Sequence, residues 1–114
     1  MLDQINLGVM LKKKKLLKNK AYINGAWVDA KSGKSFEVVN PSNGQVIVNV
    51  PDLDVTDARI AIDAAHQAFP HWSKKTAKER SIILNQFYKL MLENADDLAA
   101  ILTAEMGKPL AEAK

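Results

Sequence analysis

The sequence of 114 residues contains no cysteine and only two histidines. The lack of cysteine excludes a disulfide framework, a thiolate metal site and a cysteine nucleophile within these residues. His66 and His71 are five residues apart, which is not the spacing of four that places two metal ligands on one face of a helix. We therefore interpret each histidine as a surface residue or as one whose hydrogen bonds are satisfied.

Long apolar runs and glycine-rich loops are missing as well. No apolar run approaches the roughly 20 residues that span a bilayer, so we expect no membrane partner. Gly25, Gly33 and Gly44 each stand alone at an expected turn, and no Gly-x-Gly-x-x-Gly pattern opens a helix after a strand. These residues therefore offer no cradle for a phosphate group.

Positive charge is concentrated at one end of the chain. Residues 1–20 contain six lysines and one aspartate, which leaves ten basic and twelve acidic residues for residues 21–114, so the net charge of +3 divides into +5 and −2. We expect residues 1–20 to form a basic, flexible leader and residues 21–114 to fold. Because the folded part is not basic, we expect no nucleic-acid partner. An alternative is that the run Lys12 to Lys15 binds nucleic acid or anionic lipid.

The order of charge and apolar residues in residues 1–20 is not that of a secretory signal. The lysines follow the apolar residues, whereas a signal peptide places its charges before them. We therefore expect a cytoplasmic protein. Met10 is an alternative start to Met1.

Aromatic and β-branched residues separated by turn signals predict strands in residues 21–51. Asn24-Gly25 lies between residues 21–23 and 26–28 and indicates a tight hairpin. Residues 36–39 and the alternating residues 45–50 flank the turn cluster of residues 40–44. We expect one small antiparallel sheet of about four strands.

Helical spacing dominates the residues that follow. Asp54 or Thr56 can cap a first helix, which Pro70 should end. Thr76 and Glu79 form a capping box that starts a second helical run.

The second run extends to Gly107, a residue that readily takes the left-handed conformation of a helix end. We expect two consecutive helices or one kinked helix here, in which Asp96 and Asp97 serve as capping residues. Pro109 suits the first turn of a further helix, within which the chain stops after six residues, so we expect a truncated C-terminus. The predicted fold is α+β, a small antiparallel sheet followed by two to three helices.

Apolar residues of the second run share one face, which predicts a packing partner for it. These residues are Ile83, Phe87, Leu90 and Met91. Trp27, Trp72 and Phe87 lie in apolar patterns, and we expect them to pack in the core rather than on a ligand. Spacing alone therefore indicates no active site.

Three stretches of the sequence together carry a family resemblance. They are Ile23-Asn24-Gly25-Ala26-Trp27, residues 39–47 (Val-Asn-Pro-Ser-Asn-Gly-Gln-Val-Ile) and residues 105–113 (Glu-Met-Gly-Lys-Pro-Leu-Ala-Glu-Ala). With them the chain resembles the N-terminal part of the aldehyde dehydrogenase superfamily, from about residue 16 to residue 114. Residues 21–30 and 76–80 are most similar to succinate-semialdehyde dehydrogenases.

The resemblance implies an α/β parent protein that oxidises an aldehyde to an acid with NAD or NADP and forms a homo-oligomer. In that family a cysteine thiolate attacks the carbonyl, hydride passes to the nicotinamide, and a glutamate activates the water that releases the acid. These parts lie beyond the matched region, so the resemblance implies a fragment with no catalytic residue and no bound cofactor. The alternative is a self-standing structural or interaction module with a basic tail.

One partial site is also implied by the resemblance. Many members of the family hold a monovalent cation near positions that correspond to the carbonyl of Val38 and the carboxylate of Glu105. Carbonyl and carboxylate oxygens suit a hard cation. The alternative is that Glu105 is an ordinary exposed carboxylate near a helix end.

Overall fold

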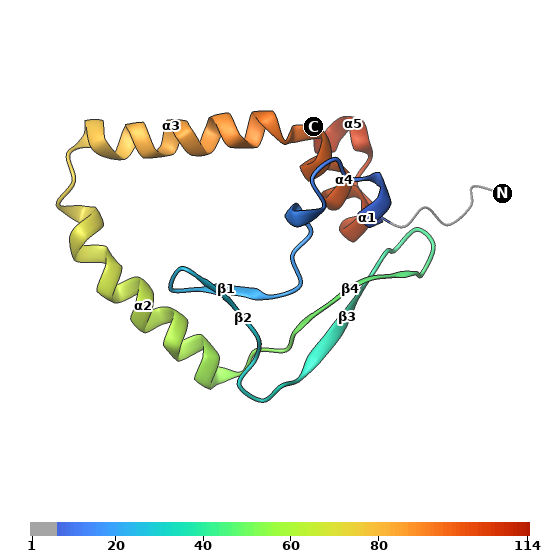
Figure 1. The fold of residues 1–114 in the computed structure, drawn as a ribbon, viewed down its shortest axis with the longest axis horizontal. Coiled ribbons are helices and arrows are strands. Elements are labelled where there is room, and N and C mark those ends of the chain that lie inside the picture. The colour runs from blue at the N-terminus through green and yellow to red at the C-terminus, as the bar shows by residue number, and fades with distance from the viewer. Residues whose placement is uncertain (1–6) are drawn as a thin grey trace.

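The computed structural model describes residues 7–114 as two β-hairpins followed by a series of helices (Figure 1). This arrangement confirms the α+β class. In chain order the elements are α1 (Leu7–Met10), the 3-10 helix η1 (Lys14–Leu16), β1 (Ala21–Ile23), β2 (Ala26–Val28), β3 (Ser35–Val39), β4 (Val46–Pro51), α2 (Val55–Ser73), α3 (Ala77–Glu93), α4 (Ala95–Met106) and α5 (Leu110–Ala113).

The predicted Asn-Gly hairpin is confirmed. β1 and β2 pair antiparallel, and Asn24 and Gly25 both have positive φ, 51° and 79°, as a two-residue turn of this type requires. The other two strands form a second antiparallel pair in which Val38 lies opposite Val48, with a register shift between Val38 and Val39.

The prediction of one four-stranded sheet is wrong, because the two hairpins form separate two-stranded sheets. The chain leaves β2 through a turn in which Gly33 N–H donates to the carbonyl of Ala30 at 2.9 Å. The N–H of Lys31 donates to a carboxylate oxygen of Asp57 at the start of α2. These bonds direct the chain towards α2, so β3 does not lie beside β2.

The start of α2 follows the capping prediction, whereas its end does not. The Asp54 carboxylate accepts the N–H groups of Thr56 at 2.7 Å and Asp57 at 3.2 Å. The expected stop at Pro70 is wrong, because the helix continues to Ser73. A proline in the last turn removes one backbone hydrogen bond near an end that already lacks several partners, so a short continuation is tolerated.

The second helical run is two helices, α3 and α4, separated at Asn94. Thr76 and Glu79 form the predicted capping box, with Thr76 N–H 2.7 Å from the Glu79 carboxylate and Glu79 N–H 3.2 Å from the Thr76 hydroxyl. Gly107 ends α4 with φ of 75°, in the left-handed region, as predicted. Local signals of this kind are read correctly because the groups that bond lie within one turn of each other.

The molecule is open. In Figure 1, α2 and α3 extend along two sides, and α1, α4 and α5 gather at one corner. The radius of gyration is 17.2 Å, whereas a compact domain of this length has about 13 Å. Among the described residues only Leu11, Ala30 and Ala99 are buried apolar residues.

The apolar face of α3 therefore exists as predicted but has no cover within the described chain. Its four residues, Ile83, Phe87, Leu90 and Met91, are between 41% and 64% exposed. The expectation that Trp27 and Phe87 pack in a core is wrong, since both are exposed. Trp27 instead lies 5.1 Å from the ring of Tyr22 and 4.6 Å from the ammonium of Lys18. One hairpin offers too little neighbouring surface to bury an indole.

Candidate functional site

A hollow of about 670 Å³ lies between the β3–β4 turn and the C-terminal end of α4. It joins the second and third stretches that the sequence analysis singled out, residues 39–47 and 105–113. Its lining residues are Leu7, Met10, Asn40, Ser42, Asn43, Gln45, Val46, Ile47, Ala100, Thr103, Ala104, Gly107, Lys108, Pro109 and Leu110.

The turn above this hollow is held by its own asparagines. The Asn40 side chain accepts the N–H of Ser42 at 2.8 Å, and the Asn43 side chain accepts the N–H of Gln45 at 3.0 Å. The backbone of Asn40 and Gln45 closes the turn with a further bond of 2.8 Å. Asparagine side chains commonly satisfy turn amides in this way. The conformation of the turn is thus held by bonds within the turn, independently of its contact with α4.

Gly107 is the point of closest approach between the two stretches. A Cβ at this position would lie 3.3 Å from Cγ of Pro41, and φ of 75° is one that side-chain-bearing residues rarely adopt. Glycine therefore serves two purposes here, since it ends α4 and lets the β3–β4 turn approach the helix end.

The lining of the hollow suits positioning rather than catalysis. Among the described residues that line it, Lys108 is the one with an ionisable side chain. The hydroxyl of Thr103 is buried and has no hydrogen-bond partner within the part of the chain that the structure describes. A hydroxyl without an adjacent base is a weak nucleophile, so these groups do not form a catalytic set.

The two residues of the predicted cation site occupy separate elements. Val38 is half-buried on β3, Glu105 is exposed in the last turn of α4, and neither lines the hollow. Residues 7–114 contain no cluster of three or more histidine or acidic side chains that could hold a metal ion. The pairing of Val38 with Glu105 stays a prediction.

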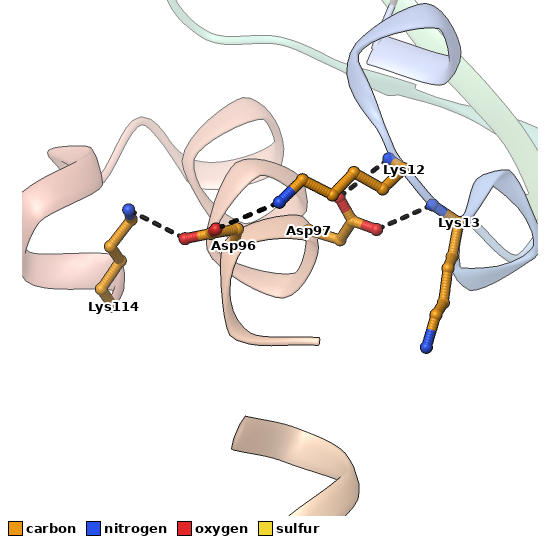
Figure 2. Close-up of polar contacts among 5 residues, drawn as sticks. All are labelled: Lys12, Lys13, Asp96, Asp97 and Lys114. Carbon is orange, nitrogen blue, oxygen red and sulfur yellow. Dashed lines mark hydrogen bonds and ion pairs between the residues drawn. The ribbon is translucent and has the colours of Figure 1, made fainter. Parts of the chain in front are cut away.

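A buried polar contact that joins segments distant in sequence is made by Asp97, at the start of α4 (Figure 2). One carboxylate oxygen accepts the N–H of Lys12 at 3.0 Å and the other accepts the N–H of Lys13 at 2.8 Å. Asp97 is 6% exposed, and the neighbouring Leu11 is 4% exposed. Residues 11–13 are therefore docked on α4. Residues 1–6 lie outside the described residues, and the flexible leader of residues 1–20 stays a prediction.

A second buried aspartate repeats this arrangement at the start of α2. Asp57 is 4% exposed and accepts the N–H of Lys31 at 3.3 Å, next to the buried Ala30. It also accepts the N–H of Asp54 at 3.3 Å, which completes a capping box. Each aspartate is the third residue of its helix, and each holds a segment distant in sequence. The sequence analysis identified Asp97 only as a capping residue, and no local pattern indicates which distant amide such a carboxylate binds.

Asp96, beside Asp97, makes exposed ion pairs with two lysines (Figure 2). Its carboxylate lies 2.9 Å from the Lys114 ammonium and 3.5 Å from the Lys12 ammonium. The hydrogen bond and charge of Lys114, followed by the charge of Lys12, lower the pKa of Asp96. Exposed pairs of this kind add little to stability.

The helix N-termini of this structure do not fit the pyrophosphate of a dinucleotide. Such a group binds free N–H groups at a helix start that follows a parallel strand. Here the N–H groups at the starts of α2 and α3 bond to Asp54 and Thr76, and acidic residues stand in the first turns of α2, α3 and α4. Both sheets are antiparallel. The described residues therefore provide no cradle for NAD or NADP.

Comparison with known sequences relates most of this chain to one family. Residues 27–114 match the profile of the aldehyde dehydrogenase family. The chain is 52% identical over 103 residues to 3-sulfolactaldehyde dehydrogenase of Pseudomonas putida. This match covers 90% of this chain and 21% of the relative. It is 50% identical over 106 residues to glutarate-semialdehyde dehydrogenase of Pseudomonas putida, covering 93% and 22%.

Succinate-semialdehyde dehydrogenases are similar to the same extent. The NADP(+) enzyme GabD of Escherichia coli is 50% identical over 99 residues, covering 87% of this chain and 20% of the relative. A crystal structure of succinate-semialdehyde dehydrogenase from Burkholderia pseudomallei superposes with a TM-score of 0.88 at 47% identity, over 90% of this chain and 21% of that one. The chain spans about a fifth of the length of the curated relatives it matches.

Proposed function

Because the chain belongs to the aldehyde dehydrogenase family, we propose that it forms the N-terminal part of an enzyme that oxidises succinate semialdehyde to succinate with NAD or NADP. The observation that carries the proposal is the close superposition on succinate-semialdehyde dehydrogenase at 47% identity, with a TM-score of 0.88. A cytoplasmic location and a homo-oligomeric parent protein are parts of the same proposal.

The names of the relatives also support a broader class of substrate, to which succinate semialdehyde belongs. 3-Sulfolactaldehyde, glutarate semialdehyde and succinate semialdehyde are all short aldehydes that carry an anionic group, a sulfonate or a carboxylate. We therefore expect the parent enzyme to prefer an aldehyde with an acidic group over an apolar aldehyde of equal length.

Within the enzyme, this segment has a structural role. The β3–β4 turn and the end of α4 meet at Pro41 and Gly107, and the apolar face of α3 remains available for packing. By itself the chain should be inactive, since it contains no cysteine and its hollow holds no acid–base pair. The cation ligands Val38 and Glu105 would need further ligands from elsewhere in the parent.

A chimeric enzyme tests the structural role. In the Escherichia coli relative, residues equivalent to 16–114 are replaced by those of this chain, and NADPH formation from succinate semialdehyde is followed by absorbance. We expect turnover within about tenfold of the unmodified enzyme, a change of roughly 1.4 kcal/mol in the barrier. The chain alone, assayed with NAD and NADP, should not exceed the blank.

Two results contradict the proposal in different ways. Turnover by the isolated chain would show that it carries catalytic groups of its own. A folded chimera that has lost activity would favour the alternative of a self-standing interaction module. The coding sequence after residue 114 provides an independent check, since we expect a glycine-rich cofactor loop and then a cysteine motif there.

A further inference from the structure

The N-terminal strap, defined here as residues 11–13, is tied to α4 by a single buried carboxylate. Both oxygens of Asp97 are used, one for each of the N–H groups of Lys12 and Lys13. Hydrogen bonds to a charged acceptor are stronger than neutral ones, and two of them fix the direction of the backbone as well as its position. Leu11 adds the only buried apolar side chain of the strap.

Other contacts of the strap are weak by comparison. The ion pair between Lys12 and Asp96 joins side chains that are 79% and 60% exposed, so solvent screens it. The side chain of Lys13 is exposed. Within the strap, the contacts to α4 are therefore concentrated at Asp97 and Leu11, while α1 makes contacts of its own with α4.

The strap also determines where α1 lies. α1 ends at Met10, directly before Leu11, and the N–H of Leu11 donates to the carbonyl of Leu7 at 3.2 Å. Leu7 and Met10 line the hollow and form its wall on the α1 side, together with residues of the β3–β4 turn and of α4. Figure 1 shows α1 against α4. A free strap would therefore remove this wall.

We propose that Asp97 is the release point of a movable wall. While its carboxylate holds the strap, α1 closes one side of the hollow. When that contact is lost, residues 7–17 detach and the hollow opens, while the two hairpins, α2 and α3 keep their structure. The inference rests on the contacts within this chain and holds whether or not the parent enzyme acts on succinate semialdehyde.

The contact of the second buried aspartate, Asp57, is separate from that of Asp97, so losing the Asp97 contact should release only residues 7–17. Asp57 holds Lys31 beside Ala30 at the start of α2, and no residue of that contact touches Asp97 in the hydrogen bonds of the structure. In Figure 1 the start of α2 lies at the bottom of the view, away from α4 at the upper right. The two contacts should therefore open independently.

Hydrogen exchange on the full chain tests this with crossed variants. In Asp97→Asn, one acceptor oxygen is replaced by a donor of the same shape, so the amides of Lys12 and Lys13 should exchange about tenfold faster, as expected for losing one hydrogen bond to a charged group. The amide of Lys31 should keep its rate in the same sample. In Asp57→Asn the amide of Lys31 should exchange faster, and the amides of Lys12 and Lys13 should keep their rates. Asp96→Asn is the matched control, and it should change neither set because its ion pairs are exposed.

A thiol reporter measures the opening of the hollow. The chain has no cysteine, so Ala104→Cys places a unique thiol in the lining of the hollow. Adding Asp97→Asn should raise its labelling rate by the same factor as the exchange of Lys12 and Lys13, whereas adding Asp96→Asn should not.

Three outcomes would overturn the proposal. Unchanged exchange of Lys12 and Lys13 in Asp97→Asn would mean that Asp97 does not hold the strap. Equal loss of protection at Lys31 would mean that Asp97 supports the whole fold and that no separate wall exists. Faster exchange at the strap with unchanged labelling of Cys at position 104 would mean that α1 stays in place without it.

Discussion

Replacing Phe87 by lysine should weaken the association of this chain with itself without lowering its folding stability. Phe87 is 64% exposed on α3, on the same face as Ile83, Leu90 and Met91. Burying a whole phenylalanine side chain contributes about 2 to 3 kcal/mol, so covering this exposed part contributes roughly 1.5 kcal/mol. Two equivalent copies in one contact would lose about 3 kcal/mol, which corresponds to a dissociation constant roughly a hundredfold higher.

Self-association is expected because the chain exposes more surface than a compact domain. Its accessible surface is 8975 Å², whereas a compact protein of this mass exposes about 6,200 Å². A stable protein–protein interface buries about 1,600 Å² in total, so the surplus is large enough to form one. The exposed apolar residues of α3 should also bind hydrophobic dyes and promote aggregation.

Sedimentation velocity across a range of protein concentrations, together with dye binding and circular dichroism melts, measures both parts of the prediction. The matched control is Ala99→Lys, because Ala99 in α4 is 1% exposed and a charge placed there should lower the melting temperature. The reasoning is refuted if Phe87→Lys lowers the melting temperature as much as Ala99→Lys does. It is also refuted if the unmodified chain is a compact monomer with a sharp melt and no dye binding.

Further predictions concern the helix ends. Gly107→Ala should destabilise the fold by about 1 to 2 kcal/mol, because φ of 75° is costly for alanine and its Cβ would press on Pro41; thermal melts should show the loss, and Pro41→Ala should relieve only the steric part. Thr76→Ala should cost about 1 kcal/mol in the same assay, whereas Ser81→Ala on the surface of α3 should cost little. The backbone and side-chain hydrogen bonds of Thr76 lower the pKa of Glu79 below the ordinary 4.5, so this carboxylate stabilises the fold above pH 4.5 and ceases to do so as the pH falls through its folded pKa. Glu79→Gln should therefore flatten the acid dependence of the melting temperature, and an unchanged slope would contradict this.

Local features of the fold were predictable because their bonding groups are neighbours in sequence. The capping box of Thr76 and Glu79, the turn at Asn24 and Gly25, and the left-handed end at Gly107 each depend on a few adjacent residues. The number of sheets was not predictable in this way, since it depends on the bond between Lys31 and Asp57, 26 residues apart. Pairing between distant segments has no local signature.

The candidate site was likewise predictable where local sequence determines it and not where distant segments pair. The resemblance of residues 39–47 and 105–113 to one family indicated that both stretches matter, and the structure brings them together at Pro41 and Gly107. The hydrogen bonds between Asp97 and the strap were not predicted, because an aspartate in the first turn of a helix is already explained as a capping residue. The exposed face of α3 was predicted as apolar, yet apolar periodicity does not state whether a partner is present.

The contact between Lys12 and Asp97 also sets an order of events during synthesis. Its two ends are separated by 85 residues. A ribosome adds roughly 5 to 20 residues per second, so the strap emerges about 4 to 17 seconds before the carboxylate that binds it. During that interval its lysines and Leu11 are available to chaperones and to the ribosome surface. Both hairpins and α2 are made within this time, so among residues 7–114 the corner at α4 assembles after them.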